Sequence, residues 1–129
     1  MKNVVDASFI LDFLLPDEQS TYVIKTFEEY KKGQITLVAP AILPFEIANG
    51  LKYAIKTKRI NQKMALELLE IFLSLKIDLL NSDIYKILKT ALEKELSIYD
   101  ASYITLSEQE NLSLLTLDRK LEKTASRKN

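Results

Sequence analysis

The 129-residue chain contains no cysteine and no histidine. Without cysteine it can form no disulfide, no thiolate nucleophile and no zinc or iron–sulfur site built on thiolates. Without histidine it lacks the usual general base, the serine–histidine triads and the most common zinc ligand. Hydrolytic chemistry in this chain therefore has to rely on carboxylates, hydroxyls, amines and hard cations.

Glycine, proline and net charge are scarce as well. With two glycines, three prolines and 47% hydrophobic residues, the composition predicts one packed, helix-rich domain over residues 1–129. Acidic and basic side chains number 18 each, so a nucleic acid would have to bind a local basic patch. No apolar run reaches the roughly 18 residues of a membrane span, and Asp6 interrupts the apolar N-terminus. We therefore expect a soluble, cytoplasmic protein.

Strand and helix patterns alternate along the chain. Short β-branched or apolar runs predict strands at residues 3–5, 35–39, 76–80 and 112–117. Helical patterns cover Ala7–Leu15, Ser20–Lys32, Leu43–Thr57, Asn61–Leu75, Ser82–Leu96 and Asp100–Glu110. This alternation predicts an α/β fold, a three-layer α/β/α sandwich around a mostly parallel sheet of four to five strands.

Two segments mark the ends of elements. Gly33 is expected to close the second helix at its C′ position, where glycine tolerates a left-handed backbone. The polar sequence from about residue 122 predicts a frayed tail after a short last helix. It contains no apolar run, so a fifth strand there is in doubt.

Four acidic residues occupy positions suited to a common site. Asp6 and Asp118 each follow a predicted strand, and the carboxyl ends of parallel strands form the crevice where ligands bind. Asp100 opens the last long helix, and Glu46 interrupts the apolar face in the first turns of its own helix. We therefore expect these four carboxylates at one edge of the sheet.

Each acidic residue also has a purely structural explanation. Aspartate is a preferred N-cap that stabilises a helix by about 1 kcal/mol, and Glu46 could interact only with the dipole of its helix. Four converging carboxylates are different, because at about 6 Å each pair repels by roughly 3 kcal/mol at an effective dielectric near 20. Such a pocket needs bound protons or a cation. Oxygen-only ligands favour Mg²⁺ or Mn²⁺, which would activate a bound water toward a phosphodiester.

Three segments carry a resemblance to a known family. The segments "VVDAS", "ILPFEIANGL" and "SIYDASYITLSEQENLSLLTLD" resemble the PIN domain over residues 3–121, and the compact length resembles the VapC-type toxins of bacterial and archaeal toxin–antitoxin pairs. The resemblance implies an RNA endonuclease with one or two Mg²⁺ or Mn²⁺ ions and an antitoxin partner. It implies catalytic and metal-binding carboxylates at Asp6, Glu46, Asp100 and Asp118, with supporting hydroxyls at Ser8 and Thr116.

Several alternatives stay open at this point. Ser8 could bond its own helix backbone, and Thr116 could simply favour a strand. The whole chain could be a catalytically inactive PIN-like module that binds protein or RNA. A phosphoacceptor receiver domain fits poorly, because Asn81 follows the third predicted strand where that fold needs an aspartate. A dinucleotide-binding domain fails for lack of a glycine-rich turn.

Basic and aromatic residues suggest where RNA could bind. Lys52, Lys56, Arg59 and Lys63 would form a positive stripe for phosphates if one helix ran through them, although a solvated face is the more common explanation. The bases could stack on tyrosines, although buried tyrosines with an exposed hydroxyl are more common. The candidates for stacking are Tyr53, Tyr99 and Tyr103.

The two N-terminal helices also contain a candidate partner surface. Its apolar residues are Phe13, Leu14, Leu15 and Tyr22. Together with the toxin resemblance, they predict a homodimer and an antitoxin segment covering the acidic crevice. The alternative is that all four belong to the internal core.

Overall fold

The structure is a computed structural model that describes residues 1–126. Its elements, in chain order, are β1 (Lys2–Val5), α1 (Ala7–Leu14), α2 (Thr21–Lys31), β2 (Thr36–Pro40), α3 (Leu43–Lys56), α4 (Gln62–Ser74), β3 (Asp78–Leu80), α5 (Ile84–Lys94), α6 (Ile98–Glu110), β4 (Ser113–Leu115) and α7 (Arg119–Ser126). None of the helices in this described part is long and apolar enough to cross a membrane.

The four strands form one parallel sheet in the order β3-β2-β1-β4. At its centre, Val4 of β1 is in register with Val38 of β2 on one side and Leu114 of β4 on the other. Because all strands run the same way, their C-terminal ends meet at one edge, which we call the carboxyl edge. The prediction of a parallel α/β sheet is confirmed, with four strands within residues 1–126.

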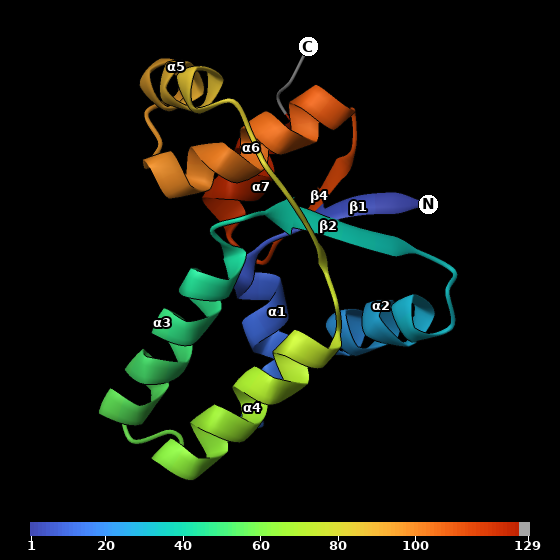
Figure 1. The fold of residues 1–129 in the computed structure, drawn as a ribbon, viewed down its shortest axis with the longest axis vertical. Coiled ribbons are helices and arrows are strands. Elements are labelled where there is room, and N and C mark those ends of the chain that lie inside the picture. Colours follow the sequence, from blue (N-terminus) through green and yellow to red (C-terminus); the bar gives the residue numbers. More distant parts are fainter. Residues whose placement is uncertain (127–129) are drawn as a thin grey trace.

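Helices cover both faces of this sheet (Figure 1). On one face, α6 packs against β1, β2 and β4, with α5 and α7 beside it. On the other face, α1 contacts α2, α3 and α4. The largest buried side chains, among them Phe9, Phe27 and Tyr103, lie in the single main core that includes the sheet residues Val4 and Val5. The three-layer sandwich therefore arises because both faces of the sheet are apolar and each needs a helical cover.

The predicted partner surface on the N-terminal helices is wrong for two of its residues. Leu14 and Leu15 are 3% and 2% exposed, so they are part of the core. Phe13 is half-buried, with its ring stacked on Phe27 at 4.2 Å between centroids. Tyr22 remains 58% exposed. The apolar residues at the C-terminal end of α1 therefore pack in the core and against α2, and they do not form a free surface.

The end of α2 agrees with the sequence. Gly33 has φ of +75°, and its N–H donates to the Tyr30 carbonyl at 3.0 Å. The N–H of Gln34 donates to the Glu29 carbonyl at 2.9 Å, which completes a Schellman motif. The predicted role of Gly33 is confirmed.

The C-terminal tail differs from the prediction. The predicted short last helix is confirmed as α7, but residues 122–126 belong to it, so fraying from about residue 122 is wrong for them. The reason is local: Asp118 accepts a hydrogen bond from the Leu121 N–H at 3.0 Å, and Leu121 is buried against the core. The rest of the predicted frayed tail, residues 127–129, lies outside the described residues.

Candidate active site

Asp6 connects the ends of two neighbouring strands. It follows β1, is 4% exposed, and caps α1 by accepting a hydrogen bond from the Phe9 N–H at 3.0 Å. The same oxygen, Oδ1, accepts from the Ser8 hydroxyl at 2.8 Å, and Oδ2 accepts from the Thr116 hydroxyl. Burial raises the pKa of Asp6, the bonds from Thr116, Ser8 and Phe9 oppose this, and the charge of Asp118 adds to it.

The hydroxyls of Ser8 and Thr116 also hold the loop after β4. Ser8 Oγ accepts from the Leu117 N–H at 2.9 Å, and Thr116 Oγ1 accepts from the Asp118 N–H at 3.0 Å. The two hydroxyl oxygens are 3.3 Å apart. Both hydroxyls therefore bond to Asp6 and to the segment that carries Asp118. This places them beside the acidic residues, while their supporting role in catalysis stays a prediction.

Asp118 and Asp100 occupy different helical positions. Asp118 is exposed and caps α7 through Leu121. Asp100 is not a cap, because α6 begins at Ile98 and Ser97 accepts the hydrogen bond from the Asp100 N–H at 3.0 Å. The prediction that Asp100 opens its helix is therefore wrong by two residues. Burial raises the pKa of the half-buried Asp100, and the charge of Asp118 adds to this while that of Lys120 opposes it.

Glu46 reaches this region from the first turn of α3. Its Oε1 accepts a hydrogen bond from the Tyr103 hydroxyl at 2.6 Å. Burial raises the pKa of Glu46, the bond from Tyr103 lowers it, and the charges of Asp100 and Asp6 raise it further. Tyr103 is 1% exposed, so the idea that it stacks on RNA bases is wrong. Its link to Glu46 was missed, although Tyr103 lies three residues after Asp100 on the same helix and so shares its face.

We expect Tyr103→Phe to weaken divalent-cation binding about tenfold while the chain still folds. The phenylalanine keeps the buried ring but frees Glu46 Oε1, and losing a group that orients a metal ligand typically costs about 10- to 100-fold in affinity. Titration of Mn²⁺ into the wild type and the variant measures this, and thermal unfolding confirms the fold. Equal affinities would mean that Tyr103 serves the core alone.

Four pairwise interactions connect the acidic residues in a closed loop. The charge of Asp118 affects Asp6 and Asp100, and the charges of Asp6 and Asp100 both affect Glu46. We call Asp6, Glu46, Asp100 and Asp118 the carboxylate ring. Its members come from the ends of β1 and β4 and from the first turns of α3 and α6, at the carboxyl edge. Each of the four residues is thus within electrostatic range of two others.

The ring can be compared with what a cation requires. Its donors are carboxylate and hydroxyl oxygens, which fit Mg²⁺ or Mn²⁺ and not soft metals. Among residues 1–126, however, no three acidic side chains are gathered closely enough to hold a metal ion. Asp118 is occupied in capping α7 and Glu46 in bonding Tyr103. The donor chemistry fits a hard cation, and the side chains would have to close around it.

The basic residues do not form the predicted stripe on one helix. Lys52 and Lys56 are on α3, which ends at Lys56, and Lys63 is on α4, because the chain turns at Lys58 with φ of 62°. Arg59 lies in the turn between them. Its guanidinium bonds Asp17 at 2.9 and 2.7 Å and Glu18 at 2.5 Å. Arg59 is thus bound to acidic residues of the same protein. Of the four basic residues, Lys52 and Lys56 are the two that lie on one helix, α3.

Two adjoining cavities connect this pair to Glu46. The first, of about 310 Å³, is lined by Ile42, Phe45, Glu46, Asn49 and Tyr99. The second, of about 480 Å³, is lined by Asn49, Gly50, Lys52, Tyr53 and Lys56. Asn49 lines both, so they follow one another along α3. A chain of phosphates could pass from the acidic residues to the lysines along this face.

Known proteins resemble the chain over nearly its whole length. A family model described as the PIN domain matches residues 4–127. Ribonuclease VapC3 of Pyrobaculum aerophilum is 30% identical over 125 residues, which is 94% of this chain and 92% of that protein. The crystal structure of PAE2754, also from Pyrobaculum aerophilum, aligns with a TM-score of 0.72 and 25% identity, covering 94% of this chain and 85% of the other. The resemblance expected from the sequence is confirmed, and the chain belongs to the PIN-domain family.

Proposed function

We propose that this protein is an endoribonuclease that hydrolyses RNA with the help of Mg²⁺ or Mn²⁺, bound as one or two ions by Asp6, Glu46, Asp100 and Asp118. The observation that carries the proposal is the closed carboxylate ring at the carboxyl edge of the sheet. Membership of the PIN-domain family and likeness to a protein named as a ribonuclease support it.

The buried Asp6 and the half-buried Glu46 are suited to a cation. Asp6 and Glu46 have raised pKa values because burial disfavours their charged forms, so a positive ion would restore the charge that burial opposes. A bound Mg²⁺ or Mn²⁺ supplies a water of lowered pKa and stabilises charge on the phosphodiester. Ser8 and Thr116 hold Asp6 in place, and Tyr103 holds Glu46. These contacts orient two of the four proposed ligands, Asp6 and Glu46.

The direct test is cleavage of single-stranded RNA by the purified wild-type protein. We expect cleavage with Mg²⁺ or Mn²⁺ and none with EDTA, because the chain has no histidine to replace the cation. Cleavage that continues at full rate in EDTA would argue against the metal. Absence of cleavage under every divalent condition would favour an inactive binding module instead.

Lys52 and Lys56 are proposed to bind RNA phosphates beyond the carboxylate ring. Changing both to glutamine should weaken RNA binding and reduce the slope of log K against log salt by about 1.4, because each phosphate contact contributes about 0.7 for single strands. Lys63→Gln is the matched control, because Lys63 lies on α4 and does not line the cavity. Binding measured over a range of salt concentrations tests this. Equal salt slopes for the double variant and for Lys63→Gln would show that Lys52 and Lys56 do not bind RNA phosphates.

The relative named VapC3 also supports a partner, and we propose that the chain is the toxin of a type II pair, forms a homodimer and binds an antitoxin protein. Two helices have exposed leucines. On α4, Leu66 is 65% exposed and Leu73 is 58% exposed. On α5, Leu88 is 49% exposed and Leu92 is 72% exposed. Exposed apolar groups of this kind mark interaction surfaces.

Glutamate substitutions can assign these surfaces. Leu73→Glu on α4 and Leu92→Glu on α5 should each abolish whichever contact, with a second copy or with the antitoxin, the substituted helix makes. The monomer should still fold, because both side chains are more than half exposed. Light scattering measures the homodimer, and co-purification with the protein encoded beside this chain measures the antitoxin. A monomeric wild type that binds no co-encoded protein would contradict the proposal.

A further inference from the structure

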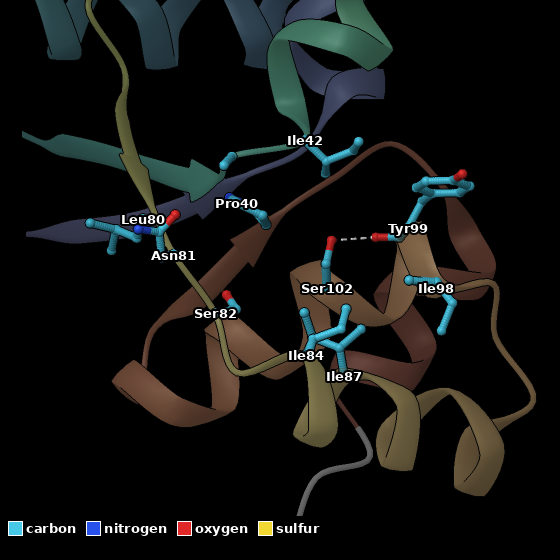
Figure 2. A pocket seen from close by; sticks show the side chains of 11 residues that line it. Pro40, Ile42, Leu80, Asn81, Ser82, Ile84, Ile87, Ile98, Tyr99 and Ser102 are labelled. Atoms are coloured by element: carbon cyan, nitrogen blue, oxygen red, sulfur yellow. Dashed lines mark hydrogen bonds between the residues drawn. The ribbon is translucent and has the colours of Figure 1, made fainter.

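An apolar cavity of about 270 Å³ adjoins the proposed site. It lies between the ends of β2 and β3 and the starts of α5 and α6, and it is lined by Pro40, Ala41, Ile42, Leu80, Asn81, Ser82, Ile84, Ile87, Ile98, Tyr99 and Ser102. Figure 2 shows Asn81 on one side of the cavity and Tyr99 on the opposite side, with Ile42 above and Ile84 and Ile87 below. Its volume is just below the roughly 300–1,000 Å³ of sites for small molecules, which suits a single ring system.

The cavity continues into the carboxylate region. Ile42 and Tyr99 line both this cavity and the one that contains Glu46. Tyr99 is 56% exposed and directly precedes Asp100. The cavity that contains Lys52 and Lys56 shares Asn49 with the middle one, so the three cavities follow one another: an apolar end, a centre that contains Glu46, and a basic end. That order matches a nucleotide chain, which carries an apolar base beside a charged backbone.

Polar groups are also present in the apolar end. Asn81 is exposed, and its amide can both donate and accept hydrogen bonds, as the edge of a base requires. Ser82 Oγ is buried and has no hydrogen-bond partner within the described chain. The Ser102 hydroxyl, by contrast, already donates to the Tyr99 carbonyl at 2.6 Å. An unsatisfied buried hydroxyl is unfavourable, and a polar atom of a bound ligand would satisfy it.

We propose that this cavity binds one unpaired nucleobase of the RNA, next to the phosphate that lies at the carboxylate ring. Tyr99 provides the stacking surface at its mouth, and Asn81 and Ser82 contact the edge of the base. The inference rests on the proposed nuclease function and adds that one base of the single-stranded RNA leaves the stack and enters this cavity. A base fits better than an apolar side chain of a partner, since it matches both the exposed aromatic ring and the polar groups.

The test uses RNA in which one base at a time is missing. A short single-stranded RNA that the wild type cleaves with Mn²⁺ is remade as a series of abasic versions, and kcat/KM is measured for each. For the wild type, we expect one abasic position beside the cleaved bond to lower kcat/KM about tenfold. For Tyr99→Ala, we expect kcat/KM for the intact RNA to be about tenfold lower than for the wild type. Removing the base at that position should not lower the kcat/KM of this variant further. Tyr99→Phe, which keeps the ring, should behave as the wild type.

Other outcomes separate this inference from the proposed function. If the wild type cleaves RNA but Tyr99→Ala cleaves it equally well, or is still sensitive at the same position, the cavity does not bind a base. If Tyr99→Ala weakens only the binding of a co-encoded protein, the cavity holds an apolar side chain of that partner. If the wild type cleaves no RNA, both proposals fail. Asn81→Asp should change which base is preferred at that position, and an unchanged preference would overturn the role of Asn81.

Discussion

Replacing Asp6 with asparagine is expected to lower RNA cleavage more than about 100-fold while the protein still folds. Removing even a group outside the ligand shell of a metal typically costs about 10- to 100-fold, and Asp6 is proposed as a ligand itself. Asparagine keeps the shape of the side chain and can still accept from the Phe9 N–H and the Ser8 hydroxyl. Cleavage of RNA with Mn²⁺ and thermal unfolding measure the two effects separately.

Asp83→Asn provides the matched control for this variant. Asp83 caps α5 as Asp6 caps α1, by accepting a hydrogen bond from the Tyr85 N–H at 2.9 Å, but it is not part of the carboxylate ring. If Asp6 acts only as a cap, the two variants should behave alike, because asparagine caps helices about as well as aspartate. Undiminished cleavage by Asp6→Asn would therefore contradict the nuclease assignment, whereas loss in Asp6→Asn alone is the expected result.

The second large effect is a pH-dependent difference in stability between the metal-free wild type and Asp6→Asn. The pKa of Asp6 is raised above its ordinary value of 3.8, so the folded state holds this proton more tightly than the unfolded state. The stability contribution of Asp6 is then greatest below about pH 4 and falls as pH rises through the folded pKa. Asparagine carries no charge, so we expect equal melting temperatures near pH 4 and a more stable variant near pH 7.

Mn²⁺ should reverse this order. At a concentration of about 100 Kd, a cation that binds only the folded state adds about 2.7 kcal/mol, or roughly 10 °C in melting temperature for a domain of this size. We expect that gain for the wild type near pH 7 and little of it for Asp6→Asn. Thermal unfolding at both pH values, with and without Mn²⁺, measures all four combinations. A metal-free variant that is less stable than the wild type at both pH values would refute the electrostatic account.

The position of the acidic residues was predictable because it follows from local rules. Asp6 comes after a buried β run, and a parallel sheet brings the ends of its strands to one edge. Glu46 interrupts an apolar helical face, and the predicted start of its helix at Leu43 agrees with α3. These inferences needed only the spacing of apolar residues that is typical of helices and strands. They could place the residues near one another but could not show that the side chains are coupled.

Other features depended on contacts that local patterns do not contain. The Tyr103–Glu46 bond joins residues 57 positions apart, and Leu14 and Leu15 looked free because the packing of α1 on α2 is tertiary. The start of α6 was placed at Asp100 because aspartate is a preferred N-cap, whereas the hydrogen bond from the Asp100 N–H to Ser97 Oγ shows that Ser97 caps the helix. The apolar cavity is assembled from four elements and has no local signal.

The most direct test of the carboxylate ring is a crystal soaked in Mn²⁺ and measured for anomalous scattering. We predict one or two anomalous peaks bound by oxygens of Asp6, Glu46, Asp100 and Asp118, with these side chains drawn closer together than in the metal-free protein. The same crystals of Asp6→Asn should show weaker peaks or none. A wild-type crystal in saturating Mn²⁺ with no peak among these four side chains would contradict the metal-dependent mechanism.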